Sequence, residues 1–323
     1  MHARCSVCGE PAVARVEYAR KWLCGAHFAG YVEGKVLGAL ERYRLVERGW
    51  RVLAAVSGGA DSAAMLGVLA KASVALGFRL AAVHVDLGIE GFSEASRRAV
   101  EELCGSLGVP FAVVSLPEVA GVGLPELARR ARRPVCSVCG AVKRYLVNVA
   151  AAEAGADVVA LGHHADDLLA YAVKNFLFQR LPELAKLGPK TESTGGLVGR
   201  VRPLYEVYKS EASLYARLSG LPFTEERCPY SPNRSVEGEV RAFLDSVEAR
   251  RPGFKISLAR GLARNAGLWG QGPRSPPRAC RVCGAPSEGE LCSFCRLTLK
   301  ALGRPMGDVA REKVREAVSA IKW

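Results

Sequence analysis

Short apolar blocks recur through the middle of the chain, and most are followed by a longer segment whose apolar residues have helical spacing. The blocks are rich in small and β-branched residues, which is typical of strands buried on both faces of a sheet. They span residues 51–56, 80–85, 111–116, 157–162 and 199–204. Helices are expected between them at 63–76, 94–107 and 141–154. Strands that alternate with helices predict an α/β fold, a doubly wound parallel sheet whose ligands bind at the carboxyl ends of the strands.

The segments on either side of this alternation predict smaller elements. A hairpin is expected at 12–22 and an amphipathic helix at 31–48. Later helices are expected from the fourth strand to residue 178 and at 211–219, 236–249, 256–262 and 311–323, with a mobile loop at 182–199 and a Gly/Pro linker at 267–277. We therefore predict three parts: an N-terminal module at 1–30, a catalytic domain at 31–270 and a C-terminal module at 271–323.

The first strand ends in Ser57-Gly-Gly-Ala-Asp-Ser62, which removes side chains where the backbone must turn into a helix. Free N–H groups and the positive end of the helix dipole converge there, so the turn is suited to an anion. The stretch fits neither GxxxxGK[ST] nor GxGxxG, and an ordinary βα turn is the alternative interpretation. Asp61 and Ser62 are N-cap candidates. We expect nucleotide phosphates at Ser57, Gly58, Gly59, Asp61 and Ser62.

The ends of the neighbouring strands are expected to surround the same crevice. Backbone groups at Ala55 and Val85 could read an adenine edge there, and Gly162 closes the fourth strand. Two carboxylates follow it. Asp166 is interpreted either as a helix cap or as a ligand of Mg²⁺, and Asp167 is expected to have a catalytic role.

The net charge of +13, with a pI near 9.4, indicates a polyanionic partner, although an arginine-rich surface of the thermophile type is the alternative. The densest basic run contains Arg129, Arg130, Arg132 and Arg133, and its place beside Cys136 favours phosphate-backbone binding over a solvated helix face. No run is judged long and apolar enough to span a bilayer, and the N-terminus has no signal-peptide pattern. We therefore expect a soluble, cytoplasmic protein with no membrane partner.

Eleven cysteines without a secretion signal favour metal binding over disulfides. Each end of the chain carries two knuckles with the spacing of a closed, structural zinc site, so two Zn²⁺ ions are predicted. The predicted ligands are Cys5, Cys8, Cys24 and His27 at one end, and Cys280, Cys283, Cys292 and Cys295 at the other. Cys104 lies apart from these groups and is expected to be a buried thiol.

The central pair Cys136 and Cys139 has no second knuckle nearby, and its one plausible partner is Cys228. Three thiolates can hold a [4Fe–4S] cluster and leave one iron open to an external ligand. A cysteine pair with persulfide chemistry and a zinc site with a solvent ligand are equally compatible with this spacing.

Taken together, these motifs resemble the tRNA 2-thiolation enzymes of the PP-loop ATPases, a family with a HUP-like Rossmannoid fold. The resemblance rests on the 57–62 loop, the central and terminal cysteine motifs, and the segment from Gly162 to Asp167. The segments 84–89 and 123–129 are more similar to the TtuA branch, which acts on a T-loop uridine, than to the wobble-uridine branch.

The resemblance implies that ATP is cleaved to AMP and pyrophosphate, that O2 of a tRNA uridine is adenylated, and that sulfur then replaces this oxygen. It implies a [4Fe–4S] cluster on Cys136, Cys139 and Cys228, catalytic roles for Lys143 and Asp167, and an ATP contact for Lys143. It further implies a ubiquitin-like sulfur carrier with a C-terminal thiocarboxylate, and a homodimer. Many family members carry Lys where this chain has Ala60.

Two rival interpretations come from other functional classes. An amide-forming synthetase that uses ammonia would share the phosphate loop but would not need the three central cysteines. A non-catalytic zinc-ribbon RNA-binding protein would need neither the loop nor ATP turnover.

Overall fold

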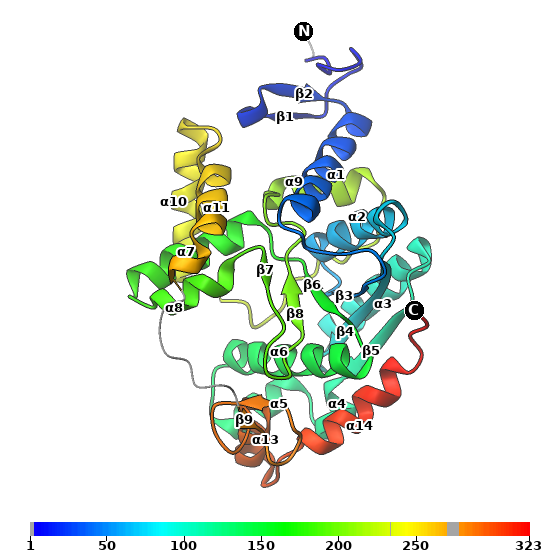
Figure 1. Ribbon diagram of the computed structural model, residues 1–323, viewed down its shortest axis with the longest axis vertical. Helices are drawn as coiled ribbons and strands as arrows, with labels where there is room; N and C mark the ends of the chain where they lie inside the picture. The colour runs from blue at the N-terminus through cyan, green and yellow to red at the C-terminus, as the bar shows by residue number, and fades with distance from the viewer. Residues whose placement is uncertain (1–2, 233, 270–277) are drawn as a thin grey trace.

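The computed structural model describes residues 3–232, 234–269 and 278–323. Its centre is a six-stranded sheet, and the first five strands of the spatial order are parallel to their neighbours (Figure 1). The order is β5 (Phe111–Ser115), β4 (Arg79–Asp86), β3 (Arg51–Ala55), β6 (Val158–Leu161), β8 (Gly199–Val201) and β7 (Lys190–Thr191). The short edge strand β7 pairs antiparallel with β8. The predicted doubly wound parallel sheet is confirmed.

Helices cover both faces of this sheet because alternate residues of its strands are buried on opposite sides. On β3, Leu53 belongs to one apolar core, whereas Val52 and Ala54 belong to another. The first core is completed by α4 (Leu116–Ala120), α5 (Leu124–Ala131), α6 (Val135–Glu153), α13 (Ser293–Leu302) and α14 (Gly307–Val318). The second is completed by α1 (Gly25–Arg42), α2 (Ala60–Leu76), α3 (Phe92–Leu107) and α9 (Lys209–Leu218).

A third, smaller core lies beyond the carboxyl end of β6. It joins α7 (Ala165–Leu177) to α10 (Val236–Arg250) and α11 (Phe254–Arg264). Figure 1 shows these three helices together on one side of the sheet, and it shows the two terminal modules at opposite ends of the molecule. The N-terminal module contains β1 (Ala14–Val16), η1 (Glu17–Ala19) and β2 (Lys21–Leu23), and the C-terminal one contains β9 (Arg278–Ala279) and β10 (Pro286–Ser287).

Several predicted boundaries were wrong. The helix α1 begins at Gly25, directly after the zinc-type residue Cys24, and it ends at Arg42, so it starts and stops six residues before the predicted span. The helix α6 also begins six residues early, at Val135. The last helix, α14, occupies 307–318, not 311–323.

The expected mobile loop at 182–199 contains regular structure. It includes most of α8 (Leu181–Leu184), the turn η2 (Ala185–Leu187) and the edge strand β7. A last short helix, α12 (Ala266–Trp269), overlaps the start of the predicted Gly/Pro linker. Residues 270–277 of that linker, and with them the boundary predicted after residue 270, lie outside the described residues.

The helix α6 also corrects the expectation about membranes. By length and composition alone it could cross a bilayer, contrary to the prediction that no run could do so. Half of its stretch is buried inside the protein, where Val142, Leu146 and Val149 join the first core. Its apolar character is therefore explained by packing against the sheet.

Candidate functional site for a nucleotide and a cysteine centre

The 57–62 loop turns between β3 and α2 through a glycine that no other residue could replace without strain. Gly58 has φ of +89°, and a Cβ atom on it would stand 2.7 Å from the carbonyl oxygen of Ser96. Ser62 closes the loop, because its hydroxyl donates to the Gly59 carbonyl at 2.8 Å and lies 3.2 Å from the Ser57 backbone nitrogen, which donates to it. The 17-residue helix α2 then directs its amino end at this turn, which suits an anion.

The prediction that Asp61 or Ser62 caps this helix was wrong. The N-cap is Gly59, whose backbone is extended, and α2 begins at Ala60. Asp61 and Ser62 therefore lie in the first turn, where an acidic side chain still faces the positive end of the dipole.

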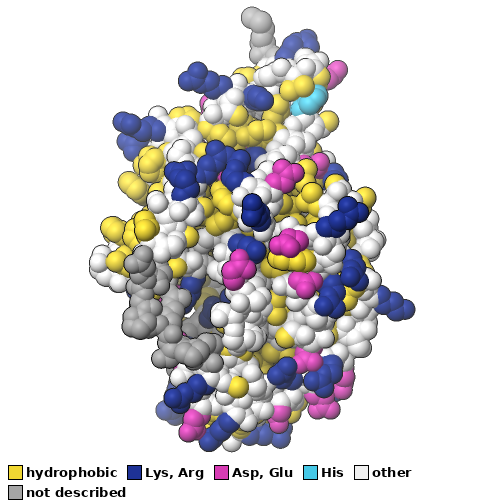
Figure 2. Space-filling view, viewed as in Figure 1, with side chains coloured by type: hydrophobic (Ala, Val, Ile, Leu, Met, Phe, Trp, Pro, Cys, Tyr) yellow, Lys and Arg dark blue, Asp and Glu magenta, His cyan; other side chains and the backbone are white. Residues whose placement is uncertain are grey.

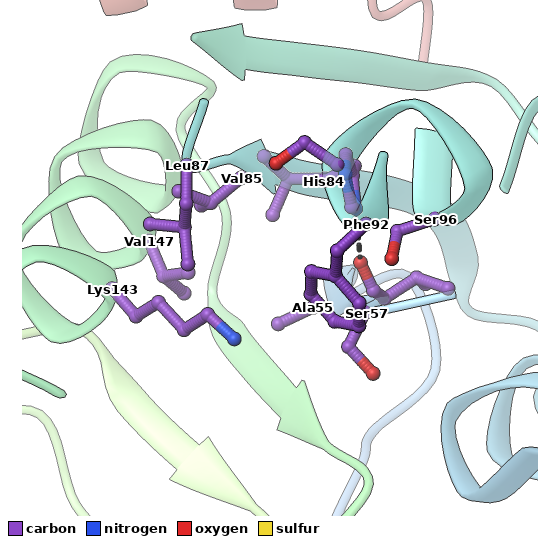
Figure 3. Close-up of a pocket in the computed structure, with 12 residues that line it drawn as sticks. Ala55, Ser57, His84, Val85, Leu87, Phe92, Ser96, Lys143 and Val147 are labelled. Atoms are coloured by element: carbon purple, nitrogen blue, oxygen red, sulfur yellow. Dashed lines mark hydrogen bonds between the residues drawn. The ribbon is translucent and has the colours of Figure 1, made fainter. Parts of the chain in front are cut away.

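A hollow of about 80 Å³ opens beside the loop, at the carboxyl ends of β3 and β4 (Figure 3). Four residues that the sequence predicted as ATP contacts line it: Ala55, Ser57, Val85 and Lys143. Gly162 meets the loop from β6, since a Cβ atom on it would stand 3.3 Å from the Cα of Ser62. Apolar lining from Leu87, Phe92 and Val147 was not predicted, because these residues reach the hollow from elements after the strand ends.

Lys143 connects this hollow to the central cysteines. Figure 3 shows its side chain extending from α6 toward the space in front of Ala55 and Ser57. Because α6 begins at Val135, Cys136 and Cys139 form its first turn and Lys143 lies one further turn along the same face. The Lys143 ammonium acts on Cys139 electrostatically, in the direction that lowers the pKa of that thiol.

The three central cysteines come together across the fold. The Cys136 thiol donates to the Tyr230 carbonyl at 3.2 Å, which places the Cys228 loop against the start of α6. Burial raises the pKa of the Cys139 thiol, and Lys143 opposes this rise while Cys228 and Cys136 add to it. These electrostatic effects place the three thiols in the same part of the site.

The spacing of these three sulfurs differs from that of a zinc site. Among the described residues, the groups of three or more Cys, His or acidic ligand atoms that lie within 4.8 Å of one another are the two terminal groups. Tetrahedral zinc with bonds of about 2.3 Å requires sulfurs about 3.8 Å apart. The sulfurs of the central trio are therefore not all within 4.8 Å of one another, in contrast to the ligand atoms of the two terminal groups.

Both terminal groups have zinc geometry. At the N-terminus the Cys8 and Cys24 sulfurs are 3.7 Å apart and the Cys24 sulfur is 3.2 Å from His27 Nδ1. At the C-terminus the Cys283 sulfur is 3.7 Å from those of Cys292 and Cys295. All eight predicted ligands fall into these two groups, with Cys5 in the first and Cys280 in the second. Such closed sets of four N/S donors fit structural Zn²⁺.

A buried histidine organises the acidic residues behind the loop. His164 is the N-cap of α7 and is 1% exposed. Its Nε2 lies 3.3 Å from Asp167 and 3.7 Å from Asp61, and its Nδ1 lies 3.5 Å from Asp166. Burial would lower the pKa of His164, but these carboxylates outweigh it and raise the pKa. The helix cap predicted at Asp166 is thus provided by His164.

Asp166 and Asp167 have different surroundings. Asp166 accepts hydrogen bonds from Lys255 Nζ at 2.6 Å and from the Lys209 backbone N–H at 2.7 Å. Burial opposes its ionisation, yet these bonds and His164 hold the pKa of Asp166 well below its usual range. Asp167 is about a quarter exposed and accepts a hydrogen bond from Arg241 at 3.0 Å. Asp166 is therefore committed to the scaffold, and Asp167 is the carboxylate available to a substrate.

Sequence reasoning missed Arg241 and Lys255, and no local signal could have revealed them. They lie 74 and 89 residues from their acidic partners, on helices that read as ordinary amphipathic segments. His164 was not predicted as a site residue, because the two carboxylates beside it were the expected functional groups.

The four arginines predicted to bind tRNA lie at the end of α5 and are all exposed. Arg129 and Arg130 both pair with Glu126, and Arg133 donates to Ser137, so part of their charge is already compensated. Arg132 is the C-cap of α5. Figure 2 shows Lys and Arg side chains spread over the whole of the face in view, not gathered in one patch. The positive charge is therefore distributed over this face of the protein.

An α/β sheet with this glycine turn at its first strand, a hollow beside it at the strand ends and acidic residues at the end of β6 defines a nucleotide-binding enzyme of the PP-loop class. Two domain families match the sequence: the PP-loop domain over residues 35–235, and the N-terminal LIM domain of the 2-thiouridine synthetase TtuA over residues 4–29. The first match covers more than half of the chain.

Relatives that match over most of the chain belong to the same class of enzyme. The chain is 36% identical over 294 residues to the tRNA-5-methyluridine(54) 2-sulfurtransferase of Pyrococcus horikoshii, covering 91% of this chain and 93% of that protein. It is 32% identical over 303 residues to the cytoplasmic tRNA 2-thiolation protein 1 of Bos taurus, covering 92% and 86%. The structure resembles the U34-tRNA thiolase NcsA of Methanococcus maripaludis, solved with its [4Fe–4S] cluster, with a TM-score of 0.77, 27% identity and 93% and 96% coverage.

The chain therefore belongs to the PP-loop family of ATP-dependent tRNA 2-thiolation enzymes. This membership confirms the predicted family and the predicted class of reaction, tRNA sulfur transfer. It also weighs against both rivals, the ammonia-dependent synthetase and the non-catalytic RNA-binding protein.

Proposed function

We propose that this enzyme adenylates O2 of the T-loop uridine of tRNA and replaces that oxygen with sulfur. The observation that carries the proposal is a single shared helix: α6 presents Cys136 and Cys139 on its first turn and Lys143, one turn later, to the nucleotide hollow. One helix thus carries both the cysteines proposed to bind the sulfur centre and the lysine of the proposed ATP site. The N-terminal match to the TtuA module supports the T-loop uridine over the wobble uridine.

In this proposal ATP occupies the hollow between the strand ends. Ser57, Gly58, Gly59, Asp61 and Ser62 surround its phosphates, with backbone N–H groups and the α2 amino end as donors. Ala55 and Val85 border the adenine. Gly162 has no side chain, so the 57–62 loop can lie close to it. Asp61 or Asp167 would accompany the Mg²⁺ of the nucleotide.

The absence of a loop lysine at Ala60 has a structural answer. Lys143 reaches the hollow from α6, and no ion-pair partner is found for it among the described residues. A positive charge beside the α-phosphate would stabilise the charge that develops as the uridine oxygen bonds to phosphorus and pyrophosphate leaves. We therefore assign the catalytic cation to Lys143.

Cys136, Cys139 and Cys228 would hold a [4Fe–4S] cluster, which when bound leaves one iron open to an external sulfur ligand. The wide spacing of their sulfurs and their partial exposure support this ligand set over a second zinc site. These three cysteines would orient the sulfur source toward the hollow. Sulfur would bond to C2 of the adenylated base as the carbon–oxygen bond breaks and AMP leaves. Asp167, held by Arg241, would handle the proton on the uracil ring.

The partners in this proposal are tRNA, a ubiquitin-like carrier that brings sulfur as a C-terminal thiocarboxylate, and a second copy of the chain in a homodimer, all in the cytoplasm. Arg129, Arg130, Arg132 and Arg133 would contact the tRNA backbone, and the two zinc modules would extend that contact. We retain the division at 1–30, 31–270 and 271–323 as a functional one, although α1 continues through residue 30 without a break.

The test is an anaerobic reaction of the reconstituted enzyme with tRNA transcript, ATP and a sulfide source, in which 2-thiouridine is measured by mass spectrometry of isolated fragments. We expect thiolation of the T-loop uridine with release of AMP. Thiolation of the wobble uridine alone would contradict the assignment, and the similarity to the U34-tRNA thiolase makes that position the one alternative to examine.

Two variants test the roles of the residues. Cys228→Ala should abolish thiolation and lower the iron content while both zinc ions remain, because Cys228 lies outside the two terminal groups. Asp167→Ala should still bind ATP but lose turnover. Full activity of either variant would remove that residue from the proposed mechanism.

A further inference from the structure

A second hollow, of about 800 Å³, lies between α7 and α10. It shares Cys136 with the cysteine group and has no lining residue in common with the nucleotide hollow. Tyr171 and Arg241 line it as well, and Arg241 holds the proposed catalytic carboxylate Asp167. A ligand in this hollow would therefore lie next to both the sulfur centre and Asp167 without displacing ATP.

The charges of this hollow are largely paired. Arg241 is bound to Asp167, and Glu237 is bound to Lys174. The two remaining charged side chains of the lining, Arg234 and Glu239, are exposed and of opposite sign. A cavity with little net charge favours a neutral ligand over a phosphate or a carboxylate.

An aromatic ring is available in the same place. Tyr171 follows Asp167 by one turn of α7 and is 40% exposed although it belongs to a helix of the core. Burial of its hydroxyl raises the pKa of Tyr171, and the nearby Asp167 and Glu237 raise it further, so the ring stays neutral. Exposed rings of this kind are the surfaces on which proteins stack single-stranded or extruded bases.

We propose that the hollow between α7 and α10 receives the target uracil, turned out of the tRNA, and that Tyr171 positions it by stacking. This inference rests on the proposed function, which requires C2 of the base to reach the sulfur centre. An enzyme cannot reach that atom while the base is stacked inside folded RNA. Tyr171 would hold the ring in the hollow that Cys136 also lines, and Arg241 of the same lining contacts Asp167.

The C-terminal tail of a sulfur carrier is the other ligand to consider for a hollow beside Cys136. Its terminal thiocarboxylate is an anion and would need an unpaired cation. Arg241 is already bound to Asp167, which leaves exposed Arg234 as the one uncompensated cation of the lining. The neutral, aromatic character of the hollow therefore favours the base.

The test uses the reconstituted holoenzyme with tRNA that carries 2-aminopurine next to the target uridine. Extrusion of the uridine removes a stacking neighbour and should brighten the probe. Stacking on an aromatic ring is worth about 1–3 kcal/mol, which is about 5- to 150-fold. We expect Tyr171→Leu to lose the brightening and to lower kcat/KM for tRNA by that factor, and Tyr171→Phe to retain both.

Two controls separate stacking from structural damage. Phe176→Leu changes an exposed ring on the same helix that does not line the hollow, and it should behave like wild type. ATP binding without tRNA, and the iron and zinc contents, should be unchanged in Tyr171→Leu.

The outcomes are distinct. Wild-type enzyme that brightens the probe and thiolates tRNA, together with a Tyr171→Leu variant that does the same, would overturn the inference and leave the proposed function intact. Normal brightening with slow sulfur uptake in Tyr171→Leu would assign the hollow to the carrier tail and would also overturn it. Absence of thiolation by wild type would contradict the proposed function, whereas absence of brightening by wild type would contradict this inference.

Discussion

Lys255 donates a hydrogen bond to Asp166 at 2.6 Å, and both side chains are less than a tenth exposed. The same ammonium contacts Asp245 at 2.7 Å and lies 4.4 Å from the centre of the Tyr208 ring. Asp166 in turn fixes the start of α9 through the Lys209 N–H. This pair therefore joins α7, α9 and α11 beside Asp167 and orders the scaffold of the site.

Removal of one member of this pair should be severe. Lys255→Met leaves the Asp166 carboxylate buried without its partner, which typically costs about 3–5 kcal/mol. The free energy of unfolding, measured by urea titration, should fall by that amount. Lys71→Met removes an exposed partner of Glu33 and should cost less than about 1 kcal/mol. Equal losses of unfolding free energy in the two variants would show that the buried Lys255–Asp166 pair stabilises the fold no more than the exposed pair does.

The loop glycine Gly58 should not tolerate a methyl group. Gly58→Ala requires a residue with φ of +89° and a Cβ atom 2.7 Å from the Ser96 carbonyl oxygen, so the loop must shift. We expect ATP affinity, measured by calorimetry, to fall at least tenfold. Gly105→Ala on α3 is the control, because its φ is not positive and no atom lies within 4 Å of the added methyl group. It should bind ATP within about twofold of wild type, and a reversed order would refute the packing argument.

Acid should destabilise the protein in part through Glu206. Burial would raise the pKa of this carboxyl, but hydrogen bonds from Arg260, Tyr43 and Arg42 lower it to about 2. Its ordinary pKa is about 4.3, so its stabilising effect is complete above that pH and is lost as the pH falls toward 2. Glu206→Gln should therefore unfold at lower urea at pH 7 and show a shallower loss of stability between about pH 4.5 and 2.5. A slope identical to wild type would exclude Glu206 as a contributor.

The C-terminal zinc module should depend on the first residue of α14. A Cβ atom on Gly307 would overlap the sulfur of Cys295 and stand 2.7 Å from Cβ of Cys283. Gly307 also accepts a hydrogen bond from Tyr145 of α6, whose ring stacks on Phe294 at 4.2 Å. Gly307→Ala should lower the zinc content from about two to about one per chain, measured by atomic absorption.

Gly289→Ala is the control for that variant, since nothing lies within 4 Å of the added methyl group. Because α6 also carries Lys143, the loss of the module in Gly307→Ala should in addition slow ATP-dependent turnover. Retention of two zinc ions in Gly307→Ala would mean that α14 can move away from the metal at little cost.

Much of this architecture was accessible from the pattern of residues. Period and composition identified all five parallel strands within one to three residues at their ends, because strands buried on both faces must be continuously apolar. The eight residues of the two terminal Cys/His groups were equally accessible, because a tetrahedral site built from adjacent knuckles requires a short, fixed spacing. The place of Ser57 and Val85 at one hollow followed from the rule that parallel strands end at the same edge.

Helix ends and capping were less accessible. Gly59 and His164, not Asp61 and Asp166, precede the two helices of the site, because the cap is chosen by where the strand must turn. Propensity ranks acidic residues as good caps, but here the close approach of β6 to the loop, at Gly162, decides the geometry. The predicted start of α6 was also too late, so Cys136 and Cys139 lie in a helical turn and not in a separate knuckle before the helix.

The sequence by itself determined the fold class, the glycine turn after the first strand and the two terminal Cys/His groups, since each is encoded in residues that are neighbours along the chain. Only the tertiary structure decided which carboxylate is free. Asp166 and Asp167 are adjacent and chemically alike, yet Lys255 binds one and Arg241 the other from helices 74 to 89 residues away. Partners at such separation leave no local pattern, because they meet only when the whole chain has packed.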